Sequence, residues 1–164
     1  MSTLLHTILA ALPVSLVLPM TVAAVTPSSE EEATAAILKQ LKRYERALNA
    51  SDIDSVMTLY AEDGVFMPQH SPPAVGHDAV RAAYQRVFGM IKLDIRFQID
   101  EIRALSRNWA YARTRSAGTV KLLASDQQPG PEANQELFLL HCETNGQWRI
   151  ARYIFSTTNP PKQP

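Results

Sequence analysis

The sequence has a single cysteine, Cys142, among its 164 residues. One cysteine excludes an intramolecular disulfide and any zinc site built from several cysteines, and its place in a predicted strand indicates a packing role. An excess of charge is missing too, because 16 Lys and Arg balance 16 Asp and Glu. Such a chain is not expected to bind nucleic acid through a basic field. The sequence also lacks a glycine-rich phosphate loop, a G-x-S-x-G elbow and a Walker lysine, which excludes the enzyme classes that depend on those motifs.

Charged residues are absent from the first 29 positions. Residues 8–18 are mostly apolar and the small residues Val22-Ala23-Ala24 follow, so residues 1–24 resemble a signal peptide cleaved after the second alanine. This interpretation predicts a secreted or periplasmic protein. The alternative is a disordered leader on a cytoplasmic protein. Pro13 and Pro19 argue against a helix that spans a membrane.

One domain is expected over residues 30–157, after a linker at 25–29 and before a flexible tail at 158–164. The apolar content of 46% is too high for a disordered chain, and the length suits one domain. Helical patterns come first and strand patterns follow, which predicts an α+β fold.

Three helices are predicted in the first half of this domain. Ser29 and Glu32 have the spacing of a capping box, and apolar residues follow at steps of three and four. Asp52 caps a short second helix. A third helix is expected from near His77 to about Met90.

The second half alternates with a period of two, which is typical of half-buried strands. After a short strand at 64–67, the predicted strands cover 93–100, 109–123, 136–144 and 147–156, with a flexible loop at 126–134.

Asn145-Gly146 is a strong hairpin signal between the last two strands. A two-residue turn would pair Thr144 with Gln147. Counting back from that pair aligns Phe138 with Tyr153 and Glu136 with Phe155, and places these four side chains on one face.

Five motifs point to a known family: Arg43-Tyr44, Ala50–Ile53, Leu59–Val65, Gly76–Tyr84 and Gly146–Tyr153. Together they resemble the ketosteroid isomerase and SnoaL-like branch of the NTF2-like superfamily, including its DUF4440-type members. The resemblance covers about residues 30 to 157. It implies a cone in which a strongly curved antiparallel sheet wraps three N-terminal helices, with an apolar pocket in its mouth. The fold hosts isomerases, cyclases, hydratases and non-catalytic modules.

The steroid isomerases of this family hold a dienolate oxygen with a tyrosine and a protonated acid, and move the proton with an aspartate. By resemblance, Tyr44 matches the catalytic tyrosine, and Tyr60 and Tyr84 match supporting tyrosines. The alternative is that they are core tyrosines whose hydroxyls are hydrogen-bonded. The two acids do not match: the base falls at Met67 and the second acid near Phe138. The resemblance therefore implies a pocket without implying the steroid reaction.

Glu136 is the one carboxylate of the hairpin on the face that the resemblance makes concave. Burial among the aromatic residues of that face would raise its pKa and suit it to general acid or base work. The alternative is a rim position, solvated or paired with Arg113 or Arg115. His70 lies in a loop beside the mouth and is a second candidate proton carrier, although a lone loop histidine is usually solvated.

Two function classes remain open. One is a cofactor-free isomerase, cyclase or hydratase that acts on a small apolar molecule with Tyr44 and Glu136. The other is a non-catalytic ligand-binding or dimeric interaction module. No metal site is expected, because the four histidines show no ligand spacing. A homodimer is predicted through the convex sheet face, where an apolar patch would otherwise be exposed; its residues are Leu137, Leu139 and Ile154, bordered by His141 and Arg152.

Overall fold

The computed structural model describes residues 27–160; the predicted signal peptide lies outside them. The described residues contain three helices: α1 (Pro27–Ala50), α2 (Ile53–Met57) and α3 (His77–Met90). Because α1 already begins at Pro27, Ser29 lies inside its first turn instead of capping it, and the expected linker is partly helical. Asp52 does cap α2, since its carboxylate accepts a hydrogen bond from the Ser55 backbone N–H at 3.0 Å.

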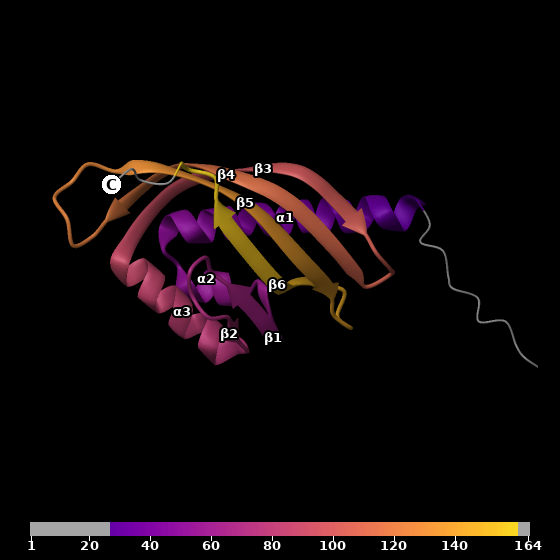
Figure 1. The fold of residues 1–164 in the computed structure, drawn as a ribbon. Coiled ribbons are helices and arrows are strands. Elements are labelled where there is room, and N and C mark those ends of the chain that lie inside the picture. The colour runs from indigo at the N-terminus through magenta and orange to yellow at the C-terminus, as the bar shows by residue number, and fades with distance from the viewer. Residues whose placement is uncertain (1–26, 161–164) are drawn as a thin grey trace, which may run out of the picture.

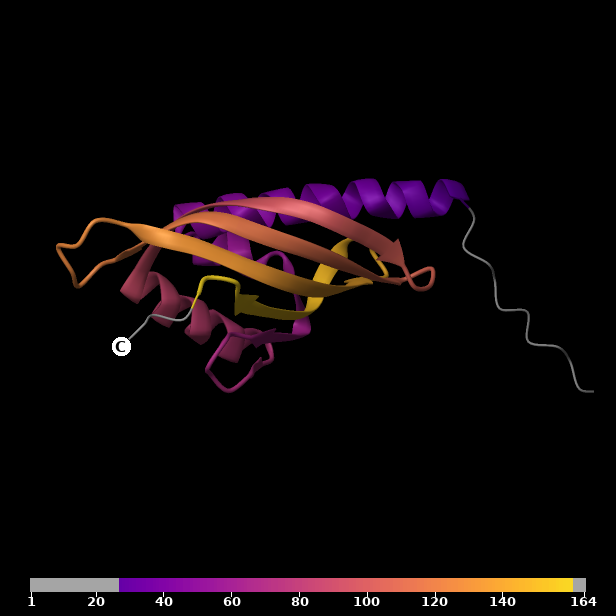
Figure 2. The ribbon, with the colours of Figure 1, turned by 45° about the horizontal axis from the view of Figure 1, so that its top comes forward.

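Six strands, two of which lie between α2 and α3 in the chain, form one curved, unclosed sheet that arches over the helices (Figures 1 and 2). They are β1 (Tyr60–Met67), β2 (Ala74–Val75), β3 (Ile91–Ala104), β4 (Trp109–Leu122), β5 (Gly130–Cys142) and β6 (Trp148–Thr157), in the order β2-β1-β6-β5-β4-β3. The chain is thus the expected α+β fold. One detail differs: β6 runs parallel to β1, so the sheet is mixed and not wholly antiparallel.

The hairpin register at Glu136 is as predicted, although the turn is not. Glu143 and Gln147 close a three-residue turn, in which Gly146 has a φ of 79° that favours glycine. The turn shifts the pairing by one residue, and a bulge between Leu139 and Leu140 shifts it back. Glu136 therefore lies opposite Phe155, because the two departures cancel.

The predicted loop at 126–134 is too long, because β5 already begins at Gly130 and pairs with β4. Pro131 is tolerated there because this stretch of β5 has no β6 residue opposite it. Beyond β6, the Thr158 N–H donates to the Ala133 carbonyl, and the Asn159 amide donates to the Pro131 carbonyl. The first residues of the expected tail are therefore attached to β5.

Side chains of the central strands alternate between an inner face, against the helices, and an outer face. Even-numbered residues of β4 from Ala110 to Ser116, and of β5 from Asn134 to Leu140, are buried, while Leu137 on the outer face is 46% exposed. The inner face forms the core together with α1 and α3. No helix within residues 27–160 is long and apolar enough to cross a membrane.

Candidate functional site

Three tyrosine hydroxyls meet in the middle of the core, each from a different element. Tyr44 comes from α1, Tyr60 from β1 and Tyr84 from α3. The Tyr84 hydroxyl lies 3.0 Å from that of Tyr60 and also hydrogen-bonds to that of Tyr44. The three tyrosines predicted from the resemblance are therefore brought together, with Tyr84 as the middle member of a chain.

Burial raises the pKa of all three tyrosines well above the usual value for a phenol. The groups are neutral hydrogen-bond donors at any physiological pH. Because each hydroxyl can accept one bond and donate another, a chain from Tyr60 through Tyr84 leaves the Tyr44 proton available to a further acceptor.

Aromatic rings surround Tyr44 and leave it only 1% exposed. The rings of Phe97, Phe138 and Tyr153 lie within 6 Å of the Tyr44 ring, at centroid distances of 5.9, 5.7 and 5.6 Å. Phe138, near which the resemblance places the family's second acid, is fully buried. The centre of the cone is consequently packed with side chains.

Phe66, which the sequence analysis missed, belongs to this aromatic cluster. Its ring stacks on Tyr84 at 4.8 Å and on Tyr153 at 5.6 Å. Met67, the position of the family's base, is half-buried and pairs with Ile154, whose side chain is 45% exposed. The sequence of β1 does not show which residues face inward, because Val65, Phe66 and Met67 are all apolar and do not alternate with polar residues.

Glu136 is buried on the inner face, with 4% of its surface exposed. The Thr114 hydroxyl, directly across on β4, donates a hydrogen bond to its carboxylate. Burial raises the pKa of Glu136, and hydrogen bonds from Thr114, Ser116 and Tyr153 offset part of that rise. The carboxyl thus holds its proton more tightly than an exposed glutamate does, as a general acid or base requires.

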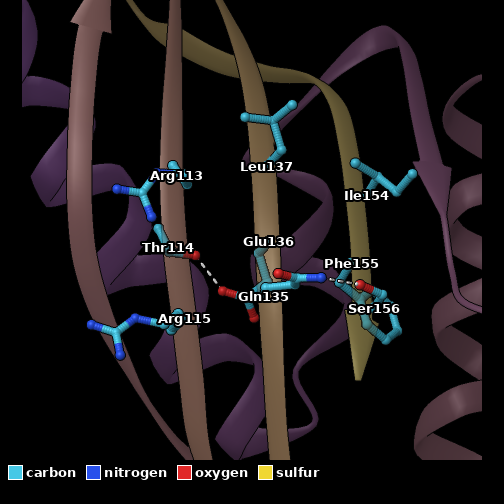
Figure 3. A pocket seen from close by; sticks show the side chains of 9 residues that line it. All are labelled: Arg113, Thr114, Arg115, Gln135, Glu136, Leu137, Ile154, Phe155 and Ser156. Atoms are coloured by element: carbon cyan, nitrogen blue, oxygen red, sulfur yellow. Dashed lines mark hydrogen bonds between the residues drawn. The ribbon is translucent and has the colours of Figure 1, made fainter. Parts of the chain in front are cut away.

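Ion pairing with the neighbouring arginines does not occur. Arg113 and Arg115 lie on the outer face and bind Asp100 of β3, with N–O distances of 3.0 and 2.9 Å. Figure 3 shows both side chains extending from β4 away from Glu136. The rim alternative for Glu136 is therefore wrong, because strand alternation puts the arginines on the opposite face.

A polar stripe runs along the inner face from Glu136 toward the loop between β4 and β5. Asn134 lies next on β5; its amide donates to Glu132 at 2.8 Å and to Ser116 at 3.4 Å. Asn134 is 7% exposed, and its Oδ1 atom is buried without a hydrogen-bond partner in the structure. An unpaired buried acceptor costs free energy. The sequence analysis did not identify Ser116 and Asn134, because nothing in the local alternation of polar and apolar residues distinguishes them from ordinary strand residues.

A pocket of about 650 Å³ opens at the end of this stripe, which we call the loop-end pocket. It is lined by Val120, Leu122, Gln127, Gln128, Gly130, Pro131, Glu132, Thr157, Asn159 and Pro160. Glu132, in its wall, is four residues from Glu136 along β5, or about 13 Å at the usual rise of a strand. The volume of the loop-end pocket suits a small organic molecule.

A second hollow, the outer groove, lies on the other side of the sheet and has a volume of about 380 Å³ (Figure 3). Its floor includes Glu136 and Phe155. The Phe155 ring packs inward on Phe66 and Tyr153. The other residues that line the outer groove are Arg113, Thr114, Arg115, Gln135, Leu137, Ile154 and Ser156.

The remaining candidates lie away from the tyrosine cluster and Glu136. His70 is exposed in the loop after β1, next to Gln69, whose side chain accepts a hydrogen bond from the Thr157 backbone. The His141 ring packs against Trp109 in a tilted arrangement, with ring centroids 4.5 Å apart. Cys142 is half-buried, and burial raises the pKa of its thiol. Within the described part of the chain, no three metal-ligating side chains converge.

Comparison with known proteins identifies the family. Residues 41–157 match the SnoaL-like domain. A ketosteroid isomerase-like protein from Erwinia carotovora atroseptica is 36% identical, with a TM-score of 0.75 over 79% of this chain and 98% of that one. A conserved protein from Planctomyces limnophilus is 20% identical, with a TM-score of 0.68 over 77% of this chain and 98% of that one. An uncharacterised protein with a cystatin-like fold from Caulobacter vibrioides is also 20% identical, with a TM-score of 0.64 over 79% and 92%. The chain therefore belongs to the SnoaL-like family of NTF2-like proteins.

Proposed function

We propose that this protein binds a small apolar carbonyl compound through the loop-end pocket and moves a proton on it with Glu136. The SnoaL-like fold is consistent with a small-molecule pocket. The observation that carries the proposal further is the buried carboxyl of Glu136. Burying an acid without a nearby cation costs stability. A role in proton transfer would explain why a glutamate occupies this position, whereas packing alone would not.

The proposed reaction needs no cofactor. Ionised Glu136 removes a proton from the carbon beside the carbonyl, and the electron pair of the broken C–H bond forms the enolate. Tyr44 donates a hydrogen bond to the enolate oxygen, supported by Tyr84 behind it. Protonated Glu136 then gives the proton to a conjugated carbon, which completes an isomerisation. If its proton first exchanges with water, reprotonation of the same carbon completes a solvent exchange instead.

Access requires a movement of the inner face. Glu136 and Asn134 are 4% and 7% exposed, so the side chains between the loop-end pocket and the acid must part as the ligand enters. The unpaired Oδ1 atom of Asn134 then gains an acceptor role toward a hydroxyl or N–H group of the ligand.

Solvent deuterium exchange tests this proposal without knowledge of the natural substrate. The protein is incubated in D2O with cyclohex-3-enone, 1-tetralone or 2-decalone, and proton NMR follows the loss of the signals beside the carbonyl. We expect exchange above the buffer rate, on the order of 100-fold, for at least one ketone. Binding of the ketones without exchange would overturn the catalytic role.

That negative result would favour a second candidate, a non-catalytic ligand-binding module. The complete enclosure of Tyr44, whose hydroxyl is already bonded to Tyr84, supports this alternative. The two candidates share the loop-end pocket and differ only in whether Glu136 transfers a proton.

We further propose that the outer face forms a homodimer. Leu137 and Ile154 are 46% and 45% exposed beside the outer groove, and pairing two such faces would remove them from water. At tens of micromolar, sedimentation should give a dimer for the natural sequence and a monomer for Leu137→Asp/Ile154→Asp. The control Val75→Asp/Met90→Asp, which changes exposed apolar residues elsewhere, should stay dimeric. A monomeric natural protein contradicts the proposal.

Export remains our proposal for residues 1–24, with a secreted or periplasmic mature protein. Its support is the charge-free apolar segment followed by small residues.

A further inference from the structure

A recess of about 400 Å³ lies between α1 and the turn that joins β5 to β6. We call it the basic recess; it is lined by Ala36, Lys39, Gln40, Arg43, Thr58, Gly146, Gln147, Trp148 and Arg149. Along β6, Arg149 is six residues from Phe155, the residue opposite Glu136, or about 20 Å at the usual rise of a strand. The recess is therefore separate from the proposed proton-transfer site.

Positive charge dominates the basic recess. Lys39 and Arg43 lie one turn apart on α1, and Arg149 approaches from β6. Among residues 27–160, Arg149 is the one member of the three with a carboxylate within 4 Å, that of Glu143 at 3.5 Å. Like charges four residues apart on a helix repel each other, so an anion between Lys39 and Arg43 would relieve a repulsion.

Arg149 is held in place before any ligand binds. Its side chain is 19% exposed, its guanidinium donates to the Thr58 carbonyl and the Gln147 side chain, and it pairs with Glu143. A guanidinium carries five N–H groups. The two hydrogen bonds use one N–H group on each terminal nitrogen, and Nε lies 3.5 Å from Glu143. One N–H group on each terminal nitrogen is left for a ligand.

We propose that the basic recess binds a small molecule that carries a phosphate or diphosphate group. A fixed guanidinium with two free N–H groups suits a phosphate, which arginine binds in a bidentate manner. Lys39 and Arg43 add two cations. Neither is ion-paired with another described residue, so no ion pair has to break when the anion binds. The volume limits the ligand to a small molecule.

Calorimetric titration with sodium pyrophosphate tests the site. We expect saturable binding of one pyrophosphate per chain at low salt, with an affinity that falls as NaCl is raised. Lys39→Ala/Arg43→Ala should weaken binding at least about tenfold, because two of the three cations are lost. Both side chains are exposed, so the variant should fold, which circular dichroism would verify.

The matched control is Lys42→Ala/Arg86→Ala, which removes the same charge from exposed residues outside the recess. At about 0.15 M NaCl it should bind pyrophosphate within about twofold of the natural protein, because neither side chain lines the recess and salt screens the exposed charges outside it. Equal weakening by both double variants, or no saturable binding, would overturn the proposal. A single-stranded RNA oligonucleotide that binds tighter than pyrophosphate, with the same dependence on Lys39 and Arg43, would also overturn it in favour of a nucleic-acid surface.

Discussion

Replacing Glu136 by Gln should lower ketone deuterium exchange by about 100-fold, to near the buffer rate, which is within the usual contribution of one general base. Gln has nearly the same shape and can still accept the Thr114 hydrogen bond, but it cannot take up the proton. Ketone binding, followed by ligand-observed NMR, should change little. The comparison therefore separates proton transfer from pocket integrity.

Glu62→Gln is the matched control for that experiment. Glu62 is an exposed glutamate of β1, so its substitution removes a carboxylate of the same type without touching the inner face. Exchange should proceed at the rate of the natural protein. If Glu136→Gln also retains the full rate, then Glu136 is not the proton carrier, and His70→Gln becomes the next variant to measure.

Phe138→Ala should cost about 3–5 kcal/mol of the free energy of unfolding, as expected for a large side chain removed from a packed core. Phe138 is fully buried and its ring stacks on Tyr153 at 4.3 Å. Its removal leaves a cavity beside Tyr44 and Tyr153. Urea unfolding followed by circular dichroism measures the loss.

Leu123→Ala provides the comparison, because Leu123 is 51% exposed. This substitution should cost roughly 0.5 kcal/mol or less, the range of ordinary surface changes. A similar, small cost for Phe138→Ala would mean that the aromatic cluster is loosely packed and that a ligand cavity exists where the structure places side chains.

Much of the fold follows from local signals in the sequence. Steps of three and four predicted the helices, and alternation placed Glu136, Phe138 and Tyr153 on one buried face. The pairing of Glu136 with Phe155 was also predicted, although two errors cancelled: the turn is one residue longer, and a bulge compensates. The β-bulge leaves no local signal here, because its extra residue, Ala151 of β6, has no glycine or proline beside it.

Long-range pairing accounts for the features that sequence reasoning missed. The inward position of Phe66 depends on the parallel pairing of β1 with β6, which is more than 80 residues away. The partner of Glu136 was sought among the charged residues Arg113 and Arg115, whereas the structure pairs it with the hydroxyl of Thr114 between them. Residues on either side of Thr114 face away because side chains alternate along a strand.

A carbon-13 NMR titration of the Glu136 side-chain carboxyl tests the central claim most directly, with the signal assigned by its loss in Glu136→Gln. Because burial raises the pKa of this carboxyl, the midpoint in the folded protein should lie above the midpoint of the same residue in urea. Between those two values the folded state binds more protons than the unfolded state, so this group makes the free energy of unfolding fall as pH rises. That dependence should be missing in Glu136→Gln. A folded midpoint at or below the unfolded one would contradict the account, because it would describe a solvated or ion-paired carboxylate without the properties of a buried proton carrier.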